Sequence, residues 1–76
     1  MRRRYELVKN TLLDLIREHG GEMTYEKMNE LANERLLKTL DGKPMWYIVT
    51  VKLDLEAQGI FERVPKTSPH VIRLVD

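Results

Sequence analysis

Three glycine-containing breaks constrain the fold more than any other feature of the sequence. The breaks are Gly20-Gly21, Asp41-Gly42 and Gly59, and each of the three segments that end at a break carries apolar residues at helical spacing. After Gly59, two short runs at 60–64 and 70–75 are typical of strands. We therefore predict an α+β fold with three helices followed by a two-stranded β-hairpin.

The first helix is predicted from about Arg3 to His19. One stripe at helical spacing forms its inward face: Tyr5, Val8, Leu12, Leu15 and Ile16. Gly20 provides the left-handed residue that commonly ends a helix. We expect His19 to interact with the C-terminal end of this helix, where a partial positive charge is favoured.

The second helix is predicted to start at Thr24, whose hydroxyl can accept a hydrogen bond from the first turn. Met23 and Met28 have the spacing of a hydrophobic staple. The expected inward stripe is Met28, Leu31, Ala32, Arg35 and Leu36, with the stem of the arginine at its edge. The expected solvated acidic face is Glu26, Glu30 and Glu34. Residues 22–24 are a candidate for a short extended segment between the first two helices.

The third helix is predicted from about Pro44 to Gln58, since proline suits a first helical turn. Its inward residues are Ile48, Val51 and Leu55, with Lys52 flanking them. At 100° per residue, the opposite side carries Trp46, Thr50, Leu53 and Ala57, with Val49 on one flank and Asp54 on the other. In the hairpin, Pro65 and Pro69 are expected at strand ends because proline cannot donate to a ladder.

Length and composition narrow the function. A chain of 76 residues forms one domain, 1–76, with a thin core and little room for a deep active-site cleft. It contains no cysteine, no run apolar enough for a membrane span and no signal-peptide pattern. The two histidines, His19 and His70, have no partner pattern for catalysis or metal binding. We expect a cytoplasmic protein that is not an enzyme and needs no cofactor or metal.

The charge is distributed unevenly although the formal total is only +1. Residues 2–4 are all arginine, and residues 60–75 carry Arg63, Lys66 and Arg73 against Glu62. The second helix, by contrast, has an acidic face. Both ends of the chain are thus candidates for contacts with an anionic partner, and the acidic face is expected to point away from it.

The element order and one motif resemble the winged helix-turn-helix superfamily. The motif is LEAQGI at residues 55–60, with Ile48 and Val51 upstream, and residues 20–32 resemble the link into the second helix. The resemblance implies that the third helix enters the major groove of double-stranded DNA and that the hairpin is the wing. It also implies a small transcriptional regulator or nucleoid-associated factor, for which a homodimer is compatible.

Under this interpretation, the basic and hydroxyl side chains contact phosphates, and the third helix contacts bases and sugars. The predicted phosphate contacts are Arg2, Arg3, Arg4, Arg63, Lys66, Thr67, Ser68, His70 and Arg73. The predicted contacts of the third helix are Lys43, Trp46, Tyr47 and Thr50. Only Thr50 on the outward side of that helix is of a type that commonly bonds to bases, so base discrimination is expected to be modest.

Two alternatives remain for the outward face of the third helix. Trp46 and Leu53 can pack under the wing or against the first helix, which would make them structural. Alternatively, Trp46, Val49 and Leu53 form an exposed apolar stripe for another protein chain, so that the domain is a protein-interaction module.

Overall fold

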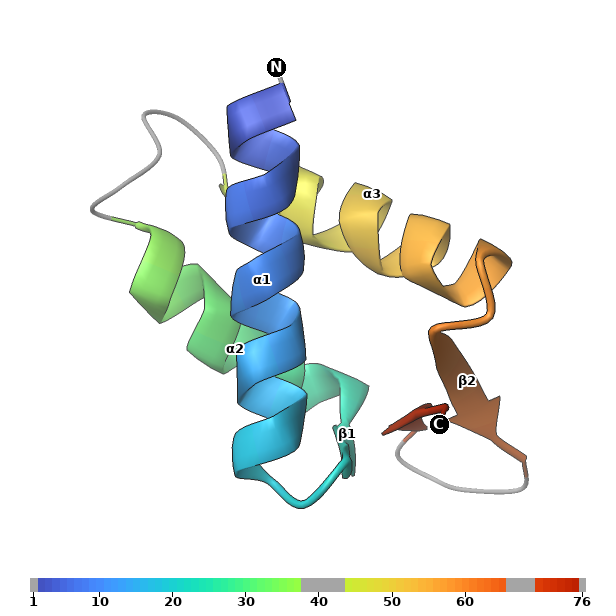
Figure 1. Ribbon diagram of the computed structural model, residues 1–76. Helices are drawn as coiled ribbons and strands as arrows, with labels where there is room; N and C mark the ends of the chain where they lie inside the picture. Colours follow the sequence, from blue (N-terminus) through green and yellow to red (C-terminus); the bar gives the residue numbers. More distant parts are fainter. Residues whose placement is uncertain (1, 38–43, 66–69, 76) are drawn as a thin grey trace.

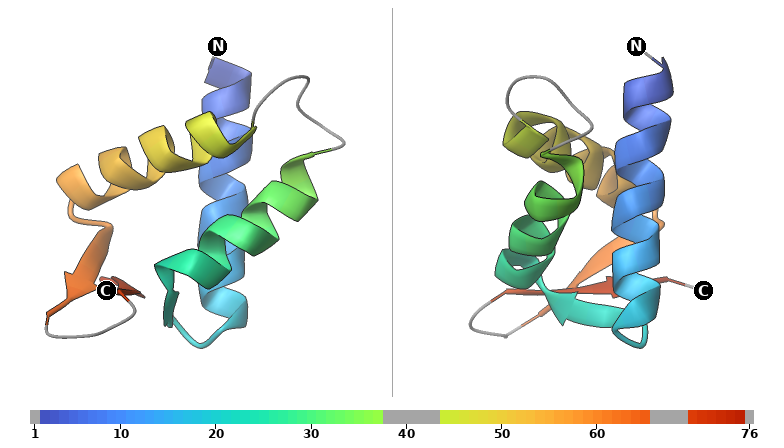
Figure 2. Two further views of the ribbon diagram at one scale, coloured as in Figure 1. Left: turned by 180° about the vertical axis from the view of Figure 1, so that it is seen from behind. Right: turned by 90° about the vertical axis from the view of Figure 1, so that its left-hand side faces the viewer.

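The computed structural model describes residues 2–37, 44–65 and 70–75 (Figure 1). Three helices, α1 (Arg2–Glu18), α2 (Tyr25–Leu36) and α3 (Pro44–Ala57), are combined with three strands, β1 (Glu22–Thr24), β2 (Phe61–Val64) and β3 (Val71–Leu74). The N-terminus lies at one end of the molecule and the sheet at the other, as both views of Figure 2 show. No helix in the described part of the chain is long and apolar enough to cross a membrane.

Helix α1 ends where the paired glycines predicted its end. Gly20 and Gly21 have φ angles of 79° and 90°, in the region that favours glycine. The Gly21 amide donates back to the Ile16 carbonyl at 2.7 Å, which satisfies a carbonyl of the last turn. The His19 ring nitrogen Nδ1 lies 2.8 Å from the Leu15 carbonyl, so His19 contacts the end of α1 as expected.

Helix α2 begins at the predicted cap. The Thr24 hydroxyl accepts a hydrogen bond from the Lys27 amide at 3.2 Å, and Met23 and Met28 are both buried. Arg35, predicted with its stem at the edge of the inward stripe, has an exposed side chain that forms an ion pair with Glu18 of α1 at 2.6 Å. That hydrogen bond holds the pKa of Glu18 below its usual value.

The sheet has three strands and not two as predicted, because residues 22–24, the candidate extended segment, form β1 and join the two C-terminal strands. Strand β3 lies in the middle, in the order β1-β3-β2, and both pairings are antiparallel. Met23 of β1 faces Ile72, and Phe61 of β2 faces Leu74. Met23, Ile72 and Phe61 are all buried. The pairing of β1 with β3 therefore covers the core beside α2. The strands are shorter than the predicted runs by one residue at several ends.

The core lies between the three helices and one face of the sheet. Its buried apolar residues are Val8, Leu12, Leu15, Ile16, Met23, Met28, Ala32, Leu36, Ile48, Val51, Leu55, Phe61 and Ile72. Tyr5, predicted on the inward stripe, is only half-buried. Lys52, predicted to flank the core, is 1% exposed, with its Nζ 3.8 Å from the centre of the Tyr25 ring and 3.6 Å from Glu56 Oε2.

Candidate interaction surface

The outward face of α3 carries an exposed apolar stripe. Trp46 is 66% exposed and Leu53 is 49% exposed, while Thr50 is exposed and Val49 is half-buried between them. We call these four residues the α3 stripe. Trp46 and Leu53 are therefore not part of the buried core. A helix face that is apolar on the solvent side is unusual because it leaves hydrophobic area in water.

No charged side chain lies on the α3 stripe. The charged residues of α3 are Lys52, Asp54 and Glu56, and each has a partner elsewhere. Lys52 is buried under Tyr25, and Glu56 pairs with both Lys52 and Arg63. Asp54 Oδ2 accepts hydrogen bonds from the Tyr5 hydroxyl and, at 2.7 Å, from Gln58. The stripe is therefore uncharged. The charged residues of α3 that lie beside it are engaged in contacts with other side chains.

The predicted contacts at the start of α3 come together with the start of α1. Arg4 donates a hydrogen bond to the Tyr47 hydroxyl at 3.2 Å, and the rings of Tyr47 and Trp46 form an edge-to-face pair with centroids 5.5 Å apart. The Thr50 hydroxyl donates to the Trp46 carbonyl at 2.9 Å, which ties it to its own helix. Arg3 is exposed near this end. One flank of the stripe thus has a basic and aromatic border.

The two arginines of the ribbon are already paired with acids. Arg63 donates to Glu56 of α3 at 3.1 Å, and Arg73 pairs with Glu62 on β2. Arg73 also faces Glu22 across the β1–β3 ladder, so that the row Glu22, Arg73, Glu62 has a net charge of −1. Neither arginine offers a free positive charge to a phosphate without first breaking an ion pair.

The remaining predicted contacts are separated from this surface or lie outside the described residues. Lys43, Lys66, Thr67 and Ser68 are outside the described ranges, as is the side chain of Arg2. His70 is exposed and lines a depression of about 280 Å³ with Tyr25, Glu26 and Asn29. The Glu26 carboxylate in that depression opposes the binding of a phosphate.

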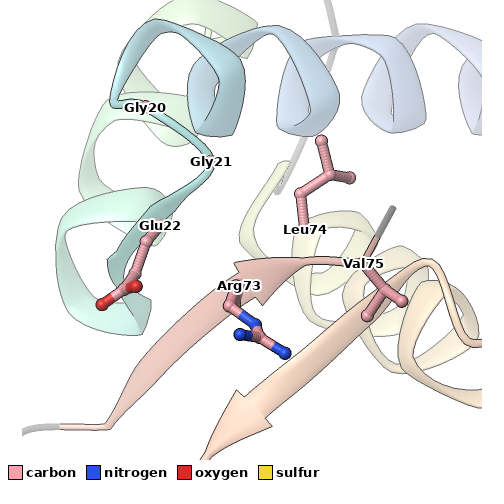
Figure 3. A pocket seen from close by; sticks show the side chains of 6 residues that line it. All are labelled: Gly20, Gly21, Glu22, Arg73, Leu74 and Val75. Atoms are coloured by element: carbon pink, nitrogen blue, oxygen red, sulfur yellow. The ribbon is translucent and has the colours of Figure 1, made fainter.

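A larger open depression of about 430 Å³ lies between the end of α1 and the end of β3 (Figure 3). Its lining is Gly20, Gly21, Glu22, Arg73, Leu74 and Val75. Leu74 points toward α1, and its amide donates to the Gly21 carbonyl at 2.8 Å. Arg73 is held by Glu62. The depression lies where the end of α1 meets the sheet, and it offers no reactive group.

A cluster of side chains that could hold a metal ion is not found in the described part of the chain. No group of three or more metal-ligating side chains occurs among residues 2–37, 44–65 and 70–75. The pKa of Tyr5 is raised, chiefly because its hydroxyl donates to the Asp54 carboxylate. Tyr5 thus serves as a hydrogen-bond donor that joins α1 to α3.

Two contacts beside the stripe were not expected from the sequence: the Lys52–Tyr25 contact and the Tyr5–Asp54–Gln58 cluster. Lys52 follows the inward residue Val51, so its side chain could be either buried or exposed. Its partner, the Tyr25 ring, is 27 residues away in the chain and gave no local signal. The i,i+4 spacing of Asp54 and Gln58 was the available signal for the second contact.

Comparison with known proteins gives one match. No curated protein and no solved structure matches the chain. A family model described as a family of unknown function (DUF6958) matches residues 1–72, which is nearly the whole chain. The chain belongs to this family, DUF6958.

Proposed function

We propose that the chain is a winged helix domain that binds another protein through the α3 stripe. The observation that carries this proposal is a neutral, apolar helix face headed by a tryptophan that is 66% exposed. Tryptophan is the residue type most enriched among the anchors of protein interfaces. A contiguous exposed apolar patch on a small domain indicates a contact surface.

The arrangement of elements supports the winged helix assignment. The order helix, strand, helix, helix, strand, strand follows the resemblance in the sequence, and β3 lies between β1 and β2. The ribbon β2–β3 follows α3 directly after Gly59. In this assignment α3 is the exposed recognition helix and the segment between β2 and β3 is the wing.

The chemistry of the surface favours a protein over a nucleic acid. Reading bases requires polar donors and acceptors on the inserted helix, and the hydroxyl of Thr50 already donates within α3. Arg63 and Arg73 are engaged in ion pairs with Glu56 and Glu62, so a phosphate would have to compete with these carboxylates. The partner that fits is an apolar helix face with a carboxylate at its edge, because Arg4 lies at the border of the stripe.

Double-stranded DNA is the second candidate, favoured by the contact of Arg4 with Tyr47 beside Trp46. This candidate carries the role of transcriptional regulator or nucleoid-associated factor in the cytoplasm. It is tested by binding of labelled duplex at about 50 and about 200 mM salt with random-sequence competitor. If DNA is the partner, Lys66→Ala lowers the slope of log binding constant against log salt concentration by about one unit. Deletion of residues 2–4 then weakens binding to all sequences. Unchanged slopes would remove both segments from the contact surface.

Site-specific photo-crosslinking tests the proposal directly. A photoreactive phenylalanine derivative replaces Leu53 on the stripe or, in the control protein, Glu30 on the exposed acidic face of α2. Each protein is irradiated in an extract of the cells that make it, after nuclease treatment. We expect a discrete protein adduct from position 53 that is absent from position 30 and is lost when Trp46→Ala is added.

Three results would contradict the proposal. They are adducts that contain only nucleic acid, adducts that are equal from both positions, and the absence of any adduct from position 53. Circular dichroism of each purified protein establishes that the comparison is made between folded chains.

A further inference from the structure

We infer that the partner of the α3 stripe is a second copy of this chain, with the two α3 helices antiparallel about a two-fold axis. This inference rests on the proposed function, because it names the protein that occupies the stripe. It also makes a geometric prediction that other partners do not share: each contact across the interface occurs twice.

The spacing of the stripe is self-complementary. Trp46 and Leu53 lie two helical turns apart, about 10 Å along the axis. The point midway between them falls between Val49 and Thr50. A two-fold axis through that point, perpendicular to α3, exchanges the two ends, so that Trp46 of one copy lies over Leu53 of the other. A surface patch that matches itself in this way is the requirement for a closed dimer.

The centre of the stripe is small enough for close approach. Thr50 is the exposed residue nearest the axis and Val49 is half-buried beside it. Two helices pack at an interaxial distance of about 8–10 Å when the residues at the contact are of modest size. The bulky side chains lie at the two ends, where a tryptophan ring of one copy meets the smaller leucine of the other.

Charges are also matched under this symmetry. A two-fold axis brings like charges together at its centre, and the α3 stripe has none there. Arg4 and Asp54 lie on the same flank of α3, the one facing α1, because Arg4 bonds to Tyr47 and Asp54 bonds to Tyr5. In the antiparallel dimer these flanks of the two copies lie on the same side of the helix pair. Arg4 of each copy therefore lies near Asp54 of the other. The two helix dipoles are opposed, which is favourable.

The size of the stripe sets the strength of the dimer. Trp46, Leu53 and the neighbouring Met45, which is 44% exposed, offer on the order of 300–400 Å² of exposed surface per copy. Stable complexes bury about 800 Å² per partner. We therefore expect a weak and transient dimer.

The absence of cysteine from the 76-residue sequence allows a clean test. Thr50→Cys places a thiol next to the axis, and Glu30→Cys places one on the exposed face of α2 as the control. Under mild oxidation at about 100 μM we expect the first variant to form a disulfide-linked dimer at least about tenfold faster than the second. Adding Trp46→Ala to Thr50→Cys is expected to remove that difference.

Sedimentation of the unmodified protein between about 5 and about 500 μM provides the second measurement. The weight-average mass is expected to rise toward twice that of the monomer, and Leu53→Asp is expected to stay monomeric over the same range. Circular dichroism establishes that each variant is folded.

A protein that stays monomeric at the highest concentration, with equal crosslinking from the two cysteine variants, overturns the second copy as the partner. The proposed function fails separately. If the photoreactive chain at position 53 then forms an adduct with a different protein, the stripe is still a protein-binding surface; if it forms none, both are wrong.

Discussion

The buried lysine of α3 provides the sharpest test of the packing. Lys52 is 1% exposed, its Nζ lies 3.8 Å from the centre of the Tyr25 ring, and Glu56 is 3.6 Å away. Its methylenes fill the same core as Ile48 and Val51. We expect that this packing, more than the charge, is what Lys52 contributes to stability, because long charged side chains bury their stems along apolar surface.

Two substitutions separate these contributions. Lys52→Ala removes three methylenes at about 0.8 kcal/mol each and leaves a cavity, so we expect the free energy of unfolding to fall by about 3 kcal/mol. Lys52→Met keeps most of the volume. It loses a cation–π contact of about 0.5–2 kcal/mol but also the cost of burying an ammonium group. Glu56 keeps Arg63 as its partner. The net change for methionine is expected to be within about 1 kcal/mol.

Urea unfolding followed by circular dichroism measures both variants. For a domain of this size, about 3 kcal/mol corresponds to a fall in Tm of about 12–24 °C. Lys27→Ala is the matched control, since Lys27 is an exposed lysine on α2 and its loss should change stability by less than about 0.5 kcal/mol. If methionine costs as much as alanine, the ammonium contacts dominate and the argument from packing is refuted.

Three further substitutions test other parts of the fold. Tyr5→Phe is expected to cost about 0.5–1 kcal/mol by removing the hydrogen bond to Asp54. Because the pKa of Tyr5 is raised in the folded state, its contribution is complete below the unfolded value of about 10 and is lost as pH rises through the folded pKa. An alkaline unfolding series should therefore show a steeper loss for the parent than for this variant; equal slopes would contradict the assignment. Gly59→Ala, at φ 79°, should lower stability by about 1–2 kcal/mol in thermal unfolding, and an unchanged Tm would show that the turn relaxes. Trp46→Ala should change the free energy of unfolding in urea by less than about 1 kcal/mol, since the side chain is mostly exposed. If the variant is unfolded, Trp46 supports the core.

The helices could be predicted because their signals are local. Glycine at the end of α1, threonine at the start of α2 and proline at the start of α3 each act within one turn, and the observed bounds differ from the predicted ones by about one residue. The apolar spacing also predicted the buried residues of α1 and α3. The outward position of Trp46 and Leu53 followed from the same 100° geometry.

What the sequence could not predict depends on contacts between distant residues. Arg35 was predicted at the edge of the inward stripe, but its ion pair with Glu18, 17 residues away in the chain, had no signal in the sequence. The third strand depends on the pairing of β1 with residues near the C-terminus. The ion pairs of Arg63 and Arg73 changed the interpretation of the wing, because a count of basic residues does not show which of them are neutralised by neighbours.

The central position of β3 has a consequence for synthesis of the protein. Strand β3 comes after β1 and β2 in the chain, yet both of them take their hydrogen-bonding partner from it. Residues 22–24 pair with residues 71–73, which are about 50 positions later in the chain, and the pairing of such distant segments is slow. A nascent chain that ends before residue 71 therefore holds three helices and no sheet, with the faces of Met23 and Phe61 still uncovered. The sheet of this domain is therefore expected to form only after residues 71–74 have been synthesised.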